Sequence, residues 1–433
     1  MKIALITAGA AGMYCGSCMR DNTLAAALIK LGHDTLLIPT YTPIRTDEEN
    51  ISETRVFMGG INVFLQQQFW LFRHTPWLLD RLLNFPRLLR WVSPLAARTK
   101  AAKLGSLTIS MLKGPRGKQR KEVRKLVEWL ATDFKPDVVL LTNVLLSGFV
   151  PELKKAWPAP VVGVLQGDDI FLEALPETDR RRCVELIHEN DPAFAGYIST
   201  SRFYADAMAP YLKLPREKIQ VVYPGINLKG HGGPREHRSA PPYIIGYFAR
   251  ICREKGFHHI VEAFRLIREM PNAPECRLKV SGWLGENNRP FFDEQMLKLR
   301  FAGLAEFVEH VDCPTHEQKV AFLQSVDVLS VPTTYHEPKG LYILEALANG
   351  TPVVQPAHGS FPELIEATNG GELVPPDDPA ALANAIVKLL NDPARRRELA
   401  ERGGRAVNEI FTAEAMALNT LSVLEQIVKK SGQ

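Results

Sequence analysis

The sequence predicts an α/β protein of two Rossmann-like domains, each a doubly wound parallel sheet, that face each other across a cleft. Three observations lead to this fold class. The 433 residues exceed the size at which one hydrophobic core usually keeps growing. Short apolar runs alternate with helical stretches in both halves of the chain. A segment over 226–242, dense in Gly, Pro, His and charge, is typical of an interdomain linker.

The half over 1–225 begins as a β-α-β unit. The run KIALIT predicts a strand, and RDNTLAAALIKLG predicts a helix over 20–32 with Gly32 at the position that favours a helix C-cap. A second strand follows in DTLLIPTY. Further strands are predicted at DVVLLTN (137–143), PVVGVLQ (160–166), AGYIST (195–200) and KIQVVYP (218–224).

The half over 243–409 repeats the alternation of strands and helices. After its last predicted strand we expect helices alone. Residues 410–433 are expected to form a carboxyl-terminal helix, for which a return to the first domain is one option. The predicted strands are YIIGYFA (243–249), CRLKVSG (276–282), EFVEHV (306–311), DVLSVPT (327–333) and PVVQP (352–356).

The composition is that of a soluble globular protein, with 45% apolar and 23% charged residues. The net charge of +4 is too small to indicate nucleic-acid binding. Six cysteines, scattered apart from Cys15 and Cys18, indicate reduced thiols, and the first residues favour a strand over a signal peptide. Since no apolar run approaches the roughly 18 residues of a membrane span, we expect a cytoplasmic protein that crosses no membrane.

A helical insertion over 69–125 interrupts the first domain. Two interpretations of it stay open. The helices either pack an apolar stripe on the domain and expose a basic face, or form a membrane-surface or acceptor-binding element. The second would place the protein peripherally at the inner face of the membrane. The residues behind both are Trp70, Phe72, Trp77, Leu78, Leu82, Phe85, Leu88 and Trp91, followed by a basic cluster from Arg98 to Lys125.

The most specific pattern is SVPTTYHEPKGLYILEALANGTPVVQPAHGSFPELIE, over 330–366. Glu337 is expected in a loop and Glu345 on the next helix. If that helix begins near Gly340, its free N–H groups favour an anionic phosphate, and the glycine lets the backbone approach closely. Glu345 could then accept hydrogen bonds from a ribose diol, and Glu337 from the hydroxyls of a sugar.

This segment resembles the donor-site signature of family 4 glycosyltransferases with the GT-B fold: a proline, a small residue, E-x7-E, an Ala/Gly turn, PVV and G-x-x-E. Lys339 stands where the family usually has an aromatic residue, which changes the expected sugar pocket beside Glu337. The matching residues are Pro332, Glu337, Gly340, Leu341, Glu345, Ala346, Gly350, Pro352, Val353, Gly359 and Glu363.

The resemblance implies an enzyme that moves a hexosyl group from a nucleoside-diphosphate sugar to an acceptor hydroxyl with retention of anomeric configuration. The nucleotide sugar is a co-substrate, and no cofactor is implied. The resemblance also implies that Glu337, Gly340, Leu341 and Glu345 contact the donor.

A second match lies in GYFARICREKG, over 246–256, in the turn after the first strand of the second domain. The family uses such an Arg and Lys to clamp the donor pyrophosphate. Arg offers a bidentate fork and Lys a point charge, and together they stabilise negative charge on a leaving diphosphate. The resemblance therefore implies Arg250, Lys255 and Glu337 as catalytic residues, with Arg250 and Lys255 also binding the donor.

The loop after the first strand carries glycines where the family often has a Gly-rich loop, and the resemblance implies a donor contact at Gly12. Cys15 and Cys18 form a C-x-x-C pair. Such a pair serves redox chemistry, a metal or loop packing, and a metal site would need a further matching Cys/His pair. We favour loop packing.

Four residues are expected to face the cleft from the first domain. Asp21 and Asn22 lie at the start of the first helix, where Asp21 either caps the helix or helps to place an acceptor hydroxyl. Gln166 stands where many family members have a histidine that contacts the sugar, so the resemblance implies that Gln166 binds the donor; it can hydrogen-bond a sugar but cannot act as a base. Asp168, like Asp21 and Asn22, is an acceptor-side candidate.

We expect catalysis without a metal ion. The sequence has no D-x-D triplet, which is the metal–diphosphate device of the other major glycosyltransferase fold. A helix dipole together with Arg250 and Lys255 can replace a divalent ion electrostatically.

The expected partners are a nucleotide sugar and an acceptor, with no nucleic acid. A polysaccharide precursor, a lipid-linked glycan and a small glycoside all stay open as acceptors. Rival functions are a phosphorylase or epimerase on the same fold, and a catalytically inactive nucleotide-sugar-binding or membrane-surface binding protein. The intact set of Arg250, Lys255, Glu337 and Glu345 favours the enzyme.

Overall fold

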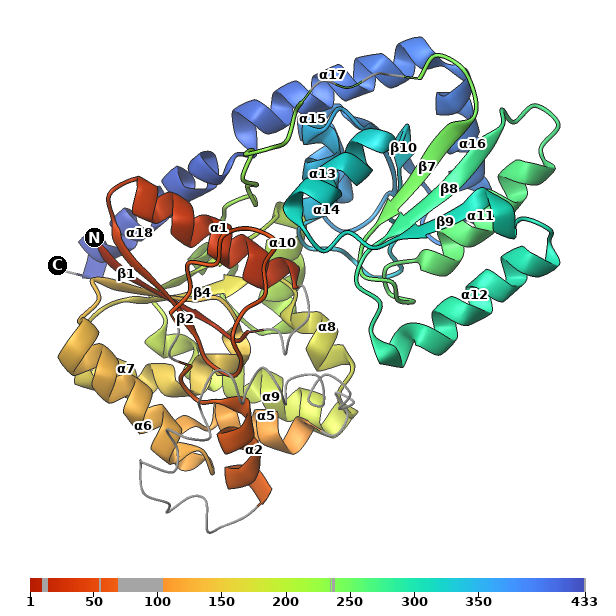
Figure 1. Ribbon diagram of the computed structural model, residues 1–433. Helices are drawn as coiled ribbons and strands as arrows, with labels where there is room; N and C mark the ends of the chain where they lie inside the picture. Colours follow the sequence, from red (N-terminus) through yellow and green to blue (C-terminus); the bar gives the residue numbers. More distant parts are fainter. Residues whose placement is uncertain (10–14, 54–55, 69–103, 234, 236–237, 432–433) are drawn as a thin grey trace. The chain divides into compact units, whose positions relative to one another are not determined.

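A computed structural model describes the chain apart from residues 10–14, 54–55, 69–103, 234, 236–237 and 432–433. The chain folds into two compact units (Figure 1). The amino-terminal unit combines Met1–Tyr223 with Ala413–Gln433, and the carboxyl-terminal unit is Pro224–Thr412. Each unit holds a six-stranded parallel sheet, which confirms the predicted α/β class with two doubly wound domains.

The amino-terminal sheet has the strand order β2-β1-β3-β4-β5-β6, and all of its pairs are parallel. Its strands are β1 (Lys2–Thr7), β2 (Asp34–Pro39), β3 (Val138–Leu141), β4 (Val161–Leu165), β5 (Gly196–Ser199) and β6 (Ile219–Val221). The helices of this unit include α1 (Gly16–Lys30), α2 (Gly60–Gln68), α5 (Gly105–Leu112), α6 (Arg120–Trp129), α7 (Val150–Ala156), α8 (Asp168–Glu173), α9 (Glu177–Asn190), α10 (Arg202–Tyr211) and α18 (Ala413–Ser431).

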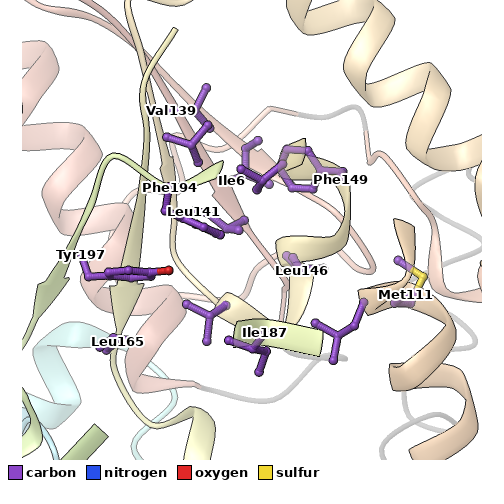
Figure 2. Close-up of a cluster of buried hydrophobic side chains, with 14 of the residues drawn as sticks. Ile6, Met111, Val139, Leu141, Leu146, Phe149, Leu165, Ile187, Phe194 and Tyr197 are labelled. Atoms are coloured by element: carbon purple, nitrogen blue, oxygen red, sulfur yellow. The ribbon is translucent and has the colours of Figure 1, made fainter. Parts of the chain in front are cut away.

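Both faces of this sheet are apolar, because successive side chains of a strand point to opposite faces. In β1, Ala4 and Ile6 join one core, whereas Ile3 and Leu5 join the other. Figure 2 shows the first of these cores, where strand side chains meet residues of the covering helices. Those labelled are Ile6, Met111, Val139, Leu141, Leu146, Phe149, Leu165, Ile187, Phe194 and Tyr197.

The carboxyl-terminal helix α18 belongs to the amino-terminal unit, and it lies alongside α1 (Figure 1). Met416, Leu421 and Leu424 of α18 are buried in the same core as Leu24 and Leu28 of α1. The chain therefore takes the return course that the sequence left open.

The carboxyl-terminal sheet has the order β12-β11-β10-β7-β8-β9, again with parallel pairs. Its strands are β7 (Tyr243–Phe248), β8 (Cys276–Ser281), β9 (Val308–Val311), β10 (Val328–Leu329), β11 (Val353–Pro356) and β12 (Gly371–Val374). Its helices include α11 (Phe257–Glu269), α12 (Arg289–Phe301), α13 (His316–Ser325), α14 (Leu341–Ala348), α15 (Phe361–Thr368), α16 (Pro379–Asn391) and α17 (Pro393–Ile410).

Two element predictions were wrong. We expected helices alone after 356, but Gly371–Val374 form β12, which pairs with β11. Asn369 ends α15 in the left-handed conformation with a φ of 48°, which redirects the chain into this edge strand. Helix α1 begins at Gly16 and not at Arg20, so the turn before it is shorter than expected.

The segment expected as a linker is part of the carboxyl-terminal unit. The Arg235 guanidinium donates to the carbonyl of Asn349 at 3.2 Å and also to Val326 and Thr351. Burial lowers the pKa of Arg235 to about 10. These contacts hold the start of the unit against the carboxyl-terminal ends of α13 and α14.

Within the part of the chain that the structure describes, every helix is too short or too polar to cross a bilayer. Most of the proposed membrane-surface insertion, residues 69–103, lies outside the described residues. Its described remainder contains α5 and the start of α6, and α6 buries Val123, Leu126 and Val127 in the core of the amino-terminal unit.

We predict that Leu424→Ala lowers the free energy of unfolding by about 2–5 kcal/mol, because it leaves a cavity under a fully buried side chain of α18. The matched control is Leu418→Ala on the same helix, where the side chain is 51% exposed and the change should stay within about 0.5 kcal/mol. Urea unfolding followed by circular dichroism measures both. Equal midpoints for the two variants would contradict the packing of α18.

Candidate nucleotide-sugar site

Three loops of the carboxyl-terminal unit meet at the edge of its sheet where the parallel strands end. They follow β7, β10 and β11. The amide of Thr334 donates to the carbonyl of Glu254 at 3.0 Å, and the amide of Ser360 donates to the carbonyl of Glu337 at 2.8 Å. Ligands of open α/β sheets bind at this edge, outside the carboxyl ends of the strands.

Two glycines permit this close meeting of loops. Gly256 has a φ of 68°, and an added Cβ would lie 1.6 Å from the carbonyl oxygen of Pro332. Gly359 has a φ of 61°, and its added Cβ would lie 2.6 Å from the amide nitrogen of Glu337. A side chain at either position would push apart the loops that carry the candidate residues.

Helix α14 begins at Leu341, directly after Gly340, which confirms the predicted start of this helix. Gly340 occupies the N-cap position with a φ of 62°, and Leu341 is half-buried at the first helical position. Because glycine has no side chain, Gly340 makes no side-chain cap to the first amides of α14. The amides of Lys339 and Gly340, just before the helix, donate to Glu337 Oε1 at 3.3 and 3.4 Å.

Glu337 is a buried carboxylate in an ion pair with Lys255. Lys255 Nζ donates to Glu337 Oε2 and to the hydroxyl of Tyr335, the latter at 2.6 Å, and this hydroxyl donates to the same carboxylate. Burial raises the pKa of Glu337, but the charge of Lys255, with help from Lys339 and Tyr335, outweighs burial and lowers it to about 2. Glu337 is therefore an ionised hydrogen-bond acceptor at any physiological pH.

Two tyrosines enclose the Lys255 ammonium group. It lies 5.0 Å from the ring centroid of Tyr335 and 5.2 Å from that of Tyr342. Burial and the neighbouring Glu337 raise the pKa of both phenols, which stay neutral. Sequence reasoning missed both residues, although each lies within five positions of Glu337 in the donor signature.

Arg250 follows β7 and is half-buried in the same loop as Lys255. Its charge acts on Tyr335, where it partly offsets the burial that raises the pKa of that phenol. Lys339, the departure from the family pattern, is 7% exposed and lies close enough to Glu337 to lower its pKa. The structure thus brings together Arg250, Lys255 and Glu337 as the sequence led us to expect, and adds the charge of Lys339.

Glu345 lies farther along α14 and forms a second buried ion pair. Lys319 Nζ is 2.6 Å from Glu345 Oε1, and their side chains are 4% and 10% exposed. Lys319 comes from α13, whose start is fixed by a capping box between Thr315 and Gln318. Sequence reasoning missed Lys319, because a lysine on a helix gives no sign that it is buried. The pair fixes one carboxylate oxygen of Glu345.

The amino-terminal unit holds a separate cavity of about 150 Å³ at the carboxyl ends of β1, β3 and β4. Gln166 and Asp168, two of the sequence candidates, lie in its wall. Gly12, another of the sequence candidates, lies outside the described residues. The full lining is Thr7, Ala8, Gly9, Cys15, Ser17, Cys18, Thr142, Asn143, Gln166, Gly167 and Asp168.

Asp21 does not cap α1, so that alternative was wrong. The helix begins at Gly16, which places Asp21 more than one turn inside it, fully buried. Its carboxylate accepts from Thr7 at 3.1 Å, from Gln166 at 3.2 Å and from Arg20 at 3.4 Å. Burial raises the pKa of Asp21, and Arg20 opposes this effect. Asp21 therefore positions Gln166 from behind the cavity wall.

Asn22 has a structural position. Its amide nitrogen donates to the carbonyl of Glu49 at 2.9 Å, and its oxygen accepts from the amide of Ile51 at 3.1 Å. Asp168 is the first residue of α8, and its side chain accepts from the backbone amide of Gln166 at 3.4 Å. Of the acceptor-side candidates, Asp168 lines the cavity, whereas Asn22 forms hydrogen bonds with the loop after β2.

Comparison with known proteins finds similarity both to a family and to solved structures. Residues 234–406 match the family described as glycosyl transferases group 1. The chain is 28% identical over 303 residues to glycogen synthase of Mycobacterium tuberculosis, which covers 68% of this chain and 70% of that protein.

Two solved structures share the whole fold. Sucrose-phosphate synthase of Thermosynechococcus elongatus matches with a TM-score of 0.72 and 21% identity, over 99% of this chain and 100% of that one. Anabaena HepE in complex with UDP and glucose matches with a TM-score of 0.67 and 17% identity, over 98% and 100%. The chain therefore has the GT-B fold, and its residues 234–406 match the glycosyl transferases group 1 family.

Proposed function

We propose that the chain is a retaining, metal-independent hexosyltransferase of the family 4 type, with a nucleoside-diphosphate sugar as donor. The acceptor is a hydroxyl of a glycan, a lipid-linked glycan or a small molecule. The observation that carries the proposal is the buried Lys255–Glu337 pair beside the start of α14. It places a cation, an ionised carboxylate and helix N–H groups at one sheet edge.

The charges of this edge suit a leaving diphosphate. Arg250 and Lys255 come from the loop after β7, and the positive end of the α14 dipole adds partial charge. Groups fixed before the reaction stabilise developing negative charge without reorganisation, which is the largest single contribution to the rate in many enzymes. These cations can take the place of a divalent ion, so we propose catalysis without a metal.

Glu337 serves as an acceptor of hydrogen bonds from sugar hydroxyls in this proposal. A carboxyl group with a pKa of about 2 is not poised to exchange a proton near neutral pH. The proton of the attacking hydroxyl would therefore pass to the leaving diphosphate, on the face from which that group departs. This front-face course accounts for retention.

Glu345 would bind the ribose of the donor. Its Oε1 is held by Lys319, and this contact fixes the direction in which the carboxylate presents its other lone pairs. HepE was solved with UDP and glucose, which makes a uridine diphosphate sugar the first donor to test. In the wall of the amino-terminal cavity, Gln166 is the proposed contact of the donor sugar and Asp168 lies on the proposed acceptor side.

We predict that Lys255→Met lowers kcat by about a hundredfold or more, as other electrostatic deletions of this kind do. The single change also leaves Glu337 buried without its cation, which should cost about 3–5 kcal/mol of folding stability. The double variant Lys255→Met/Glu337→Gln should regain most of that stability but not turnover.

Lys298→Ala is the matched control for this series, because its side chain is 57% exposed on α12. Turnover of a radiolabelled donor and thermal unfolding are measured for all variants. Normal turnover in Lys255→Met would remove Lys255 from the diphosphate site.

We predict that Glu345→Gln weakens UDP binding by roughly 10–100-fold, the loss expected for charge-assisted hydrogen bonds. The affinity for 2′,3′-dideoxy-UDP should be the same in the variant and the wild type, since that ligand has no ribose diol. Isothermal titration calorimetry measures both ligands. Glu366→Gln, an exposed glutamate on α15, is the control. A loss of equal size with both nucleotides would show that Glu345 does not read the diol.

We predict that EDTA leaves both donor binding and turnover unchanged. A thermal-shift screen with UDP, GDP, ADP and their common sugar conjugates identifies the donor, since a ligand at about a hundred times its Kd stabilises by roughly 2.7 kcal/mol. The best donor is then assayed with and without EDTA. Turnover that EDTA abolishes and manganese restores would overturn metal independence.

A further inference from the structure

Cys15 and Cys18 lie together at the start of α1. Cys15 occupies the N-cap position with extended backbone, and Cys18 is the third helical residue. Residues three apart on a helix have Cβ atoms about 5–6 Å apart, and a disulfide needs Cβ atoms about 3.5–4.5 Å apart. A disulfide between these two positions therefore requires the first turn of α1 to tighten by roughly 1–2 Å.

The two thiols have different surroundings. Cys15 is partly exposed, whereas Cys18 is 2% exposed and lies 3.9 Å from the hydroxyl of Thr7. A hydrogen bond with Cys15, followed by burial, raises the pKa of Cys18 well above its usual value. Cys15 lies where the helix dipole and the first free N–H groups favour a thiolate. One thiol is thus placed to react with solutes and the other to react with its neighbour.

Both cysteines line the cavity of the amino-terminal unit. They share its wall with Gln166 and Asp168, and the hydroxyl of Ser17 in the same turn donates to the carbonyl of Gln166 at 3.5 Å. A covalent bond between the two sulfurs would draw in the first turn of α1 and change the shape of this wall. The chemistry of the pair is therefore coupled to the cavity.

We propose that Cys15 and Cys18 form a reversible thiol–disulfide site that controls the cavity of the amino-terminal unit. The oxidant is a low-molecular-weight disulfide, RSSR. The Cys15 thiolate attacks one of its sulfur atoms and forms a mixed disulfide, and the first RS⁻ leaves. The Cys18 thiolate then attacks Cys15 Sγ, and the second RS⁻ leaves. The two protons of the cysteines go to the two released thiolates, so one disulfide is reduced to two thiols as one is formed.

The site is tested on the full-length folded protein with oxidised glutathione, followed by alkylation and tryptic digestion. Cleavage after Lys2 and Arg20 gives a peptide over 3–20 that contains Cys15 and Cys18 and no other cysteine. We expect this peptide to carry no alkyl group and to be two hydrogen atoms lighter than its dithiol form, and dithiothreitol should restore the thiols. Cys313, which is also partly exposed, should remain alkylated. Two alkyl groups on the peptide in excess oxidised glutathione would overturn the proposal.

Two variants test the order of attack. Cys18→Ala should trap glutathione on Cys15, and Cys15→Ser should leave Cys18 unmodified because that thiol is buried. Cys313→Ser is the control and should form the disulfide as the wild type does. The wild-type peptide map decides whether the disulfide forms, even if a variant fails to fold. It also needs no transfer assay, so its result is independent of the proposed function.

The control of the cavity is tested by transfer in the same samples. We expect oxidation to lower the transfer rate by about tenfold or more, since a misplacement of about 1 Å costs up to a hundredfold in rate. Dithiothreitol should restore it, and Cys15→Ser should not respond to either treatment. A disulfide that forms while transfer stays within roughly twofold would overturn control of the cavity.

Discussion

The buried ion pair between Lys255 and Glu337 is the interaction on which the candidate site depends. Removing a carboxylate from water is costly unless a cation and hydrogen-bond donors surround it. Here Lys255, Tyr335 and the amides before α14 supply them. Lys255 lies in the loop after β7 and Glu337 in the loop after β10, so the ion pair also holds these two loops together. Glycine at 256 and 359 is the steric condition for that arrangement.

The pattern of strands could be predicted from the sequence because buried parallel strands are continuous apolar runs. The carboxyl-terminal site could be predicted because its residues lie in two short motifs, so one helix start fixed the places of Gly340 and Glu345. Lys319 could not be found, since its partner is 26 residues away and only the packing of α13 on α14 brings them together. The strand β12 is short and lies at an edge, where local signals are weak.

The amino-terminal unit was harder to anticipate. We predicted Asp21 at the start of the first helix because the residues around it carry no clear signal for where that helix begins. The helix begins earlier, at Gly16, and the Asp21 carboxylate is buried behind Gln166. A glutamine beside a buried Asp–Arg pair is fixed in direction, which suits recognition of a hydroxyl. The C-x-x-C pair, which we expected to serve loop packing, lies in the same wall. In this unit, therefore, the polar side chains of Gln166 and Asp168 and the two thiols line one small cavity.

The central claim is that the diphosphate and sugar of the donor bind at the Lys255–Glu337 pair. The most direct test is a crystal structure of the chain with the nucleotide sugar that stabilises it best. Our account predicts diphosphate oxygens within hydrogen-bond distance of Lys255 Nζ and of the first amides of α14, with sugar hydroxyls on Glu337. A nucleotide bound away from these groups, with the ion pair unchanged and shielded from it, would contradict the account.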